Sequence, residues 1–287
     1  FGGALVARHL AEQGFEVDVV DPHGIATGAS SIPAALLHGR LLGDGSTMAA
    51  YRAQAYHYAR SYLGSVAGYR ATPVLQRLGP NMNERKMARI AFAYGAERDE
   101  HSWIERHRLP DGSPALLFPD AGVVDLATAT RDLLNHSRIQ ITRARPSMSP
   151  AYTIVCSALE ASRQVTDPAL ELAPIHGQLD VFDAPCTEGP FARIPQVGNG
   201  YFVPFGGLCV VGATYEYSPW TPEAATEHNR AMNLHRLSDD SRWLNRYRGT
   251  RAVTPDRLPV VGMLNDELGV ATGYGSTATT AAPLAAA

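Results

Sequence analysis

The first residues of the chain have the types and spacing of a dinucleotide-binding turn. Gly2 and Gly3 precede a helical stretch, and Asp21 ends the next strand-like run, about 20 residues after Gly3. In a G-x-G-x-x-G turn the third glycine allows close helix–strand packing, the helix N-terminus faces the pyrophosphate, and the acid binds the ribose hydroxyls. Gly3 suits the third glycine and Asp21 suits the acid. A generic strand–helix–strand unit, whose glycines only make a turn, is the alternative.

The same motif bears on the cofactor and on the extent of the chain. A carboxylate at Asp21 repels a 2′-phosphate, which favours FAD or NAD over NADP. We expect the first two glycines of the turn, and the strand that leads to them, to precede residue 1. The last residues, 285–287, read as the middle of a helix. We therefore expect the chain to be a fragment of a longer protein.

A second glycine-rich turn lies near the other end of the chain. The stretch ATGYGSTATTAAP combines a strand with Gly273, Gly275, Ser276, Thr277 and a helix start. Backbone N–H groups at such a helix start can face an anionic or electron-rich ligand edge, such as N1–C2=O of a flavin. The alternative is an ordinary helix that Ser276 or Thr277 caps.

The elements between these two turns indicate an α/β fold with an insertion. We expect helices at 3–14, 49–63 and 123–135, a helical pattern in the charged stretch 82–108, and strands at 15–21 and 151–158. From about residue 172, short β-runs separated by Gly and Pro indicate antiparallel strands. We expect 221–247 to return to helix. This order predicts a discontinuous Rossmann-like nucleotide-binding domain (1–75, 135–173 and 250–287), which would be the FAD-binding domain if the cofactor is FAD, and an inserted antiparallel-sheet substrate domain (76–134 and 174–249).

The composition excludes several classes of protein. The chain has 287 residues, of which 45% are hydrophobic and 18% charged, as in ordinary globular proteins. No apolar run approaches the roughly 20 residues that cross a bilayer, and no signal peptide is evident. Three scattered cysteines, Cys156, Cys186 and Cys209, suggest neither a disulfide framework nor a metal site, so we expect a cytoplasmic protein without a bound metal. The net charge of −3 argues against a protein that coats nucleic acid.

Taken together, the segments resemble the glycine/D-amino-acid oxidase group of FAD enzymes in content and order. The resemblance rests on Gly3 to Asp21, GASS at 28–31, PIHGQLDVF at 174–182, GYFVPFGGLCVVGATY at 200–215, RAVTPDRLPVVG at 251–262 and GYGSTATTAAPLAA at 273–286. Within that group, residues 28–63 look most like the oxidoreductase half of the bifunctional tRNA 5-methylaminomethyl-2-thiouridine biosynthesis enzymes. The chain departs from the group at Gly39, Tyr274 and Thr277 and in the strand that ends at Cys156, which bears on the substrate more than on the cofactor.

The resemblance implies an active site of defined chemistry. Such enzymes transfer hydride from an amine C–H to the flavin, and Arg251 resembles the group's carboxylate-binding arginine, with Tyr201 as its partner. A surface arginine and a half-buried strand tyrosine are the plain alternatives. The resemblance places the loop that contains Ser30, Ser31, Ala35 and Leu36 against the flavin, although helix capping also explains the serines. His38 reads as structural more readily than as a flavin contact, and Asp256 reads as a turn residue beside Pro255.

The resemblance also implies a reaction and leaves alternatives open. No cysteine lies between Tyr247 and Pro259, where covalent attachment is expected, so we expect FAD to be bound non-covalently. The implied reaction removes the carboxymethyl group from a wobble uridine of tRNA. A tRNA requires phosphate contacts. Four arginines could form a basic rim that supplies these contacts, or they could lie on an ordinary solvated helix face; they are Arg236, Arg242, Arg246 and Arg248. A small-molecule oxidase for glycine, sarcosine or a D-amino acid is the second hypothesis, and a non-catalytic binding protein is the third.

Overall fold

The computed structural model describes residues 1–96, 102–144, 149–166, 170–183, 191, 193–238 and 240–287. Its α-helices are α1 (Gly2–Glu12), α2 (Thr47–Leu63), α3 (Glu84–Ala93), α4 (Leu126–Leu134), α5 (Ala161–Gln164), α6 (Pro222–Asn233) and α7 (Ala278–Ala286), and a 3₁₀ turn spans Ala158–Glu160.

The strands form four sheets within the described residues. The largest has the order β14-β10-β13-β12-β11-β4-β6-β5, and the smaller ones have the orders β1-β8, β15-β16-β9 and β2-β7-β3. The strands are β1 (Val17–Val20), β2 (Ala35–Leu37), β3 (Tyr69–Ala71), β4 (Val74–Gln76), β5 (Glu105–Arg108), β6 (Pro114–Phe118), β7 (Gly122–Val124), β8 (Ile139–Thr142), β9 (Thr153–Val155), β10 (Ala173–Asp183), β11 (Gln196–Gly198), β12 (Gly200–Phe205), β13 (Leu208–Gly212), β14 (Trp243–Val253), β15 (Val260–Met263) and β16 (Leu268–Thr272).

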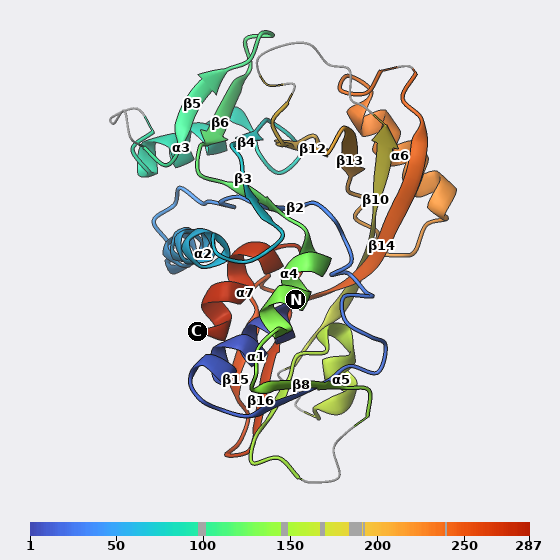
Figure 1. The fold of residues 1–287 in the computed structure, drawn as a ribbon. Coiled ribbons are helices and arrows are strands. Elements are labelled where there is room, and N and C mark those ends of the chain that lie inside the picture. Colours follow the sequence, from blue (N-terminus) through green and yellow to red (C-terminus); the bar gives the residue numbers. More distant parts are fainter. Residues whose placement is uncertain (97–101, 145–148, 167–169, 184–190, 192, 239) are drawn as a thin grey trace.

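The two halves of the molecule differ in sheet type. In Figure 1 the large sheet occupies the upper part, with α3 and α6 beside it, and α1, α7, β1 and β8 lie lower. β1 pairs with β8 in parallel, and so does β16 with β9. In the large sheet β10 pairs antiparallel with both β13 and β14. The mixed α/β architecture with a large antiparallel region is therefore confirmed, and the division into two domains at the expected boundaries stays a prediction.

Local sequence explains the helices that shape the site. Helix α1 buries one face through Ala4, Leu5, Ala7 and Ala11, which have the spacing of an amphipathic helix. Asp125 caps α4 by accepting the N–H groups of the next turn, which confirms the helix expected there. Ser46 caps α2 in the same way. These helices pack on one another around the small sheets and fix the positions of the loops between them.

Two expected helices are wrong in part. Among the described residues of the charged stretch 82–108, α3 is the only helix, and residues 105–108 form β5, which pairs with β6. In 221–247, α6 ends at Asn233, and the chain from Trp243 onward forms β14, hydrogen-bonded along its length to β10. In both cases hydrogen bonds to a partner strand override the local helical pattern: β6 directly follows β5 in the chain, whereas β10 lies far from β14 in sequence. As a consequence, Arg242 directly precedes a strand, and Arg246, Arg248 and Arg251 lie on it.

Candidate functional site

Loops from the two ends of the chain meet directly. The side chain of Thr279 donates a hydrogen bond to the backbone oxygen of Leu36 at 2.7 Å, across most of the sequence. The guanidinium of Arg40 donates to Ser276 Oγ at 2.9 Å. The loop that continues from β2 and the glycine turn before α7 are therefore neighbours, as the sequence predicted.

The start of α1 explains its glycines. A Cβ on Gly2 would lie 2.7 Å from the ring of Tyr274, and a Cβ on Gly3 would lie 3.0 Å from Cys156 Cβ. The distance at Gly2 is shorter than real Cβ contacts, and the distance at Gly3 is tighter than most of them. The missing side chains therefore let the helix start approach β9 and the 273–277 turn, the close packing that the third glycine of the motif provides.

The serine loop and Asp21 lie near this helix start. Ser30 Oγ accepts a hydrogen bond from the backbone nitrogen of Phe1 at 3.2 Å. The N–H of Ser31 donates to the Gly28 oxygen at 3.0 Å, which closes a turn and caps no helix. Asp21 Oδ1 accepts two backbone N–H groups of the loop that follows β1, each at 3.1 Å. Ser30 and Asp21 therefore lie near the start of α1, whereas Leu36 contacts α7 through Thr279.

The glycine turn before α7 has the backbone that only glycine adopts readily. Gly273 and Gly275 have φ of 75° and 54°. The N–H of Gly275 donates to the oxygen of Ala252 at 3.0 Å, next to Arg251 in the chain. Thr277 occupies the N-cap position but makes no side-chain cap; its hydroxyl donates to the oxygen of Tyr274 at 2.8 Å. Capping of α7 by Ser276 or Thr277 is therefore wrong, which leaves this helix start available to a ligand.

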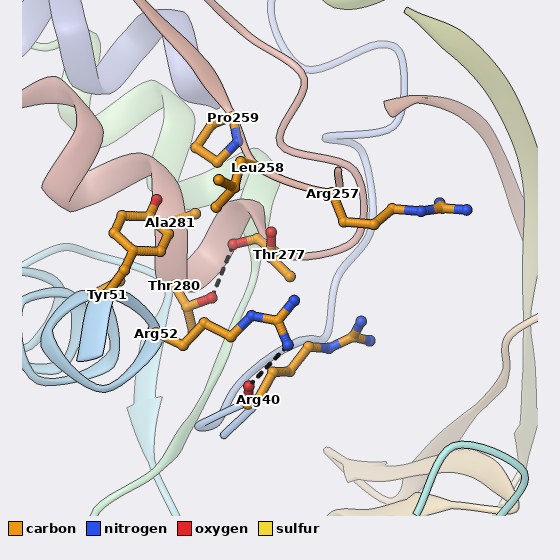
Figure 2. Close-up of a pocket in the computed structure, with 10 residues that line it drawn as sticks. Arg40, Tyr51, Arg52, Arg257, Leu258, Pro259, Thr277, Thr280 and Ala281 are labelled. Atoms are coloured by element: carbon orange, nitrogen blue, oxygen red, sulfur yellow. Dashed lines mark hydrogen bonds between the residues drawn. The ribbon is translucent and has the colours of Figure 1, made fainter. Parts of the chain in front are cut away.

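A cleft lies between α2, the start of α7 and the loop after β14. Figure 2 shows Arg40, Arg52 and Arg257 on its border, with Tyr51 and Thr277 among the lining residues. Arg52 donates to the backbone oxygen of Arg40 at 3.4 Å. Burial lowers the pKa of Arg52 and also that of Arg40. This border is positively charged.

Arg251 lies at the centre of the region. Its guanidinium packs over Gly177, where a Cβ would lie 2.6 Å from one terminal nitrogen and 2.7 Å from the other. The ring of Tyr215 covers it, with Cζ 5.4 Å from the ring centre. Burial lowers the pKa of Arg251, whereas the nearby Tyr215 and Glu216 raise it. Its Nη1 is buried and has no hydrogen-bond partner among the described residues.

Tyr201 faces the same space from β12. Its hydroxyl donates to the backbone oxygen of Ala34, directly before β2. Burial raises the pKa of Tyr201, and the charge of Arg251 lowers it, so the two groups interact electrostatically. The predicted pair therefore shares one site, with Tyr201 fixed against the loop that leads into Ala35 and Leu36.

Two cations share this space without an acidic partner. The charge of Arg251 contributes to the lowered pKa of Arg40, after burial. Within the described residues, no carboxylate forms an ion pair with Arg40, Arg251 or Arg257. Like charges that lie close together repel each other unless an anion compensates them. The arrangement is therefore suited to bind a carboxylate or another small anion.

The chemistry of the residues fits FAD on independent observations. The hydroxyls of Tyr51 and Tyr274 are buried without a hydrogen-bond partner among the described residues, and both lie near the glycine turns. Two helix starts, those of α1 and α7, offer uncapped backbone N–H groups. Phosphate oxygens and the polar edge of a flavin accept hydrogen bonds from such donors.

The comparisons with known proteins agree with this geometry. The family description "DAO: FAD dependent oxidoreductase" matches residues 1–287. The chain belongs to the DAO family of FAD-dependent oxidoreductases. The predicted family and its cofactor, FAD, are thereby confirmed.

Similar proteins agree with this family assignment in sequence and in fold. A tRNA 5-methylaminomethyl-2-thiouridine biosynthesis bifunctional protein MnmC from Maricaulis maris is 30% identical over 309 residues, covering 99% of this chain and 49% of its own. The MnmC protein of Ralstonia nicotianae is 27% identical and covers 93% of this chain. The chain thus spans about half the length of these relatives. Glycine oxidase from Bacillus cereus superposes with a TM-score of 0.78 at 16% identity, over 99% of this chain and 92% of its own.

Other predicted residues of this DAO oxidoreductase have structural roles. His38 is buried against Phe118, and burial, followed by the charge of Arg40, lowers the pKa of His38 to about 3. Asp256 accepts the N–H of Leu258 at 3.0 Å, as a turn residue does.

Cysteines and metals play no evident part in the described residues. Cys156 and Cys209 are free there, and Cys186 lies outside them. The described residues hold no group of side chains suited to a metal ion. None of their helices is both long and apolar enough to cross a membrane.

The predicted basic rim is wrong for Arg236. That residue is buried, donating to Asn233 Oδ1 at 2.7 Å, so it cannot face a phosphate. The other three each form an ion pair that neutralises them in part: Arg242 with Asp183 at 2.8 Å, Arg246 with Glu223 at 3.0 Å, and Arg248 with Glu216 at 3.1 Å.

Sequence reasoning also missed residues of the site. Arg40, Arg257 and Tyr215 were not predicted as site residues, although each lies inside a segment that carries the family resemblance. The sequence signal that could have identified the two arginines is their position: Arg40 directly follows LLHG, and Arg257 lies within TPDRLP.

Proposed function

We propose that the protein oxidises the C–N bond of a secondary amine that carries a carboxylate, with FAD as its cofactor. One observation carries this: Arg251 lies near Tyr201 and Tyr215, and its buried Nη1 has no hydrogen-bond partner among the described residues. A planar guanidinium binds a carboxylate through two parallel hydrogen bonds, which fixes the orientation of the adjacent α-carbon. The substrate carboxylate also supplies the missing counter-charge.

The residues divide into two groups by role. Arg251 binds the carboxylate, Tyr201 closes the site against Ala34, and Arg40 adds a second positive charge. FAD, when bound, supplies the acceptor for the two electrons of the amine. Residues from three segments hold it: Gly2, Gly3, Asp21, Ser30, Ser31, Ala35, Leu36, Gly273, Gly275, Ser276 and Thr277. The protein orients a neutral amine and excludes water, and this requires no separate general base.

The preferred substrate is a carboxymethylaminomethyl group on a wobble uridine of tRNA. The support is the run of relatives whose names state tRNA 5-methylaminomethyl-2-thiouridine biosynthesis, at 24–30% identity. The three arginines that remain of the rim, Arg242, Arg246 and Arg248, stand as candidate phosphate contacts. Glycine, sarcosine or a D-amino acid is the alternative substrate class. Non-covalent FAD and a cytoplasmic location stay predictions.

The test begins with the colour of the full-length protein. We expect a flavin spectrum, and release of the flavin when the protein is denatured with acid. In a strain that lacks the gene, mass analysis of the tRNA should show the wobble nucleoside retaining its carboxymethyl group, and an R251M copy should not restore it. A colourless protein would favour a non-catalytic binding role, and peroxide release on sarcosine with unchanged tRNA would favour the small-molecule alternative.

A further inference from the structure

The loop after β13 presents three large aromatic side chains to solvent. Tyr215 is 41% exposed, Tyr217 is 72% exposed and Trp220 is 39% exposed. The rings of Tyr215 and Tyr217 are 6.3 Å apart. The segment 214–221 reads TYEYSPWT and contains no aliphatic hydrophobic residue. We name this group of three side chains the aromatic ledge.

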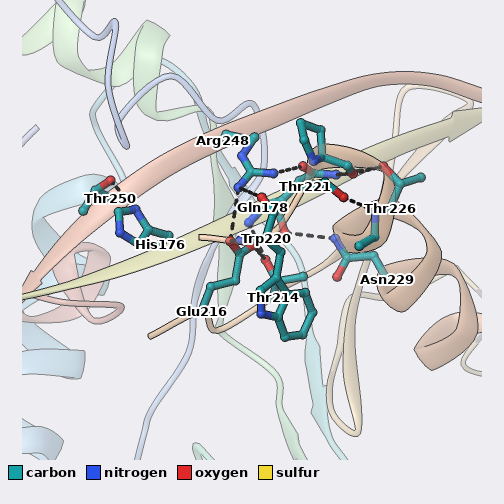
Figure 3. A network of polar contacts seen from close by, with 12 residues as sticks. His176, Gln178, Thr214, Glu216, Trp220, Thr221, Thr226, Asn229, Arg248 and Thr250 are labelled. Atoms are coloured by element: carbon teal, nitrogen blue, oxygen red, sulfur yellow. Dashed lines mark hydrogen bonds and ion pairs between the residues drawn. The ribbon is translucent and has the colours of Figure 1, made fainter. Parts of the chain in front are cut away.

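The ledge is held in place by buried polar groups. Glu216, between the two tyrosines, is only 1% exposed. Its carboxylate accepts the Trp220 N–H at 3.0 Å and Arg248 Nη2 at 3.1 Å, and also the Thr214 hydroxyl. Arg248 donates as well to the Trp220 oxygen at 3.0 Å (Figure 3). The loop is therefore fixed from within while its rings face outward, which indicates a preformed contact surface.

The ledge continues directly into the carboxylate site. Tyr215 is both the ring over Arg251 and the inner member of the ledge. Arg257 donates to the Tyr215 hydroxyl at 3.3 Å, and its backbone has a φ of 65°, a left-handed conformation rare outside glycine. Residues held in such conformations cluster at functional sites. The strained turn thus places a second guanidinium beside the ledge.

We propose that the aromatic ledge stacks the nucleobase that carries the oxidised side chain, an inference that rests on the proposed function. In a carboxymethylaminomethyl uridine, four single bonds separate the carboxylate carbon from the uracil ring, a span of about 5 Å. The centre of Tyr215 lies 5.4 Å from the guanidinium carbon of Arg251, so a carboxylate held there brings the base to the ledge. Flat rings flanked by arginine suit an unpaired base rather than an aliphatic protein surface.

In this proposal Tyr215 and Tyr217 have separate roles, because they lie at different distances from Arg251. Tyr215 contacts both the carboxylate site and the base, so its removal would affect any substrate. Tyr217 is farther out and contacts only a substrate with a ring attached. A small amino acid held at Arg251 would not extend to Tyr217, which makes this residue the discriminating position.

The experiment compares Y217A, Y217F and Y152A with wild type in the full-length flavin-bound protein. Tyr152 is 60% exposed and lies just before β9, outside the ledge, which makes it a matched control. One probe is an anticodon stem-loop carrying 5-carboxymethylaminomethyluridine, followed by the rate of flavin bleaching without oxygen. The other is acetate, which needs Arg251 but offers no ring, titrated through the flavin spectrum.

We expect Y217A to lower kcat/KM for the stem-loop about 5- to 100-fold, mainly through KM, the range measured for one base stacked on one aromatic ring. Y217F should retain most of it, and acetate affinity should change much less. Equal losses with both probes, a loss in Y152A of the same size, or no loss in Y217A would overturn the ledge and leave the proposed oxidation intact. A wild type that bleaches with sarcosine but not with the stem-loop would overturn the ledge and the tRNA substrate together. A colourless protein would overturn the proposed function itself.

Discussion

Replacing Arg251 by methionine separates a substrate-binding role from a structural one. Methionine has similar length and fills the space over Gly177 without charge. In the folded protein Nη1 of the guanidinium is buried without a hydrogen-bond partner among the described residues, and the group lies near the second cation, Arg40. A side chain kept for stability would not be left in this condition.

The size of the catalytic effect follows from the bonds that a carboxylate would make. A hydrogen bond to a charged group contributes about 1.5–3 kcal/mol, so two parallel bonds to Arg251 contribute about 3–6 kcal/mol. At about 1.4 kcal/mol per factor of ten, the R251M variant should lose roughly 10²- to 10⁴-fold in kcat/KM. The R251K variant keeps the charge but not the planar fork, and it should lose an intermediate amount.

The assay measures flavin reduction and thermal unfolding on the same samples. The contact of Arg251 with the Tyr215 ring contributes about 0.5–2 kcal/mol, whereas an unpaired buried charge costs several kcal/mol. The melting temperature of R251M should therefore equal or exceed that of wild type while activity collapses. A variant that melts well below wild type yet retains its kcat/KM would show that Arg251 is structural and refute the reasoning.

Three further predictions address the surroundings of the site. The G177A variant places a Cβ 2.6 Å from Arg251 Nη1, so it should raise KM about 10- to 100-fold with the flavin spectrum retained, by steady-state kinetics. His38 has a pKa of about 3 in the folded state against about 6.5 in the unfolded state, so the folded state binds fewer protons and loses stability as pH falls. Between about pH 7 and about pH 5 the unfolding free energy should fall by about 2 kcal/mol. The H38Q variant should abolish this loss when unfolding is measured in urea. The D180A variant removes the acceptor of Trp243 Nε1 at 3.0 Å and of three other donors. It should therefore lower the unfolding free energy, measured by tryptophan fluorescence, by about 3 kcal/mol. A loss below about 1 kcal/mol would contradict a network held by that carboxylate.

Periodicity predicted the elements whose stability is local. The helix that begins after Asp125 carries its own cap, and α1 carries its own apolar face, so both are legible in sequence. Residues 243–253 are different, because their strand conformation comes from pairing with β10, some 70 residues away in the register Ile175↔Arg251. No local window contains that partner. The expectation that helix continues to residue 247 was wrong for this reason.

The residues of the site also differ in whether they could be predicted from the sequence. The glycine turns and Asp21 could be proposed from sequence because phosphate binding at a helix start demands particular residues at fixed spacing, and their role in holding FAD stays a prediction. Arg40 could not, because its relevance comes from the bond to Ser276 at the other end of the chain. Conversely, Arg236 resembles its exposed neighbours in sequence, and only packing against Phe202 and Asn233 reveals that it is buried. Charge can be counted from sequence, whereas exposure depends on tertiary packing.

The same contacts tie cofactor binding to substrate binding. Gly275 donates its N–H to Ala252, the residue after Arg251, and Ser276 accepts a hydrogen bond from Arg40. The turn that would face the flavin is therefore bonded on one side to the strand that carries Arg251, the arginine proposed to bind the carboxylate, and on the other side to Arg40. A shift of this turn must displace at least one of the two guanidinium groups, because the bonds are short and the packing around them is dense. Order at the flavin-side turn and order at the carboxylate site should accordingly rise and fall together.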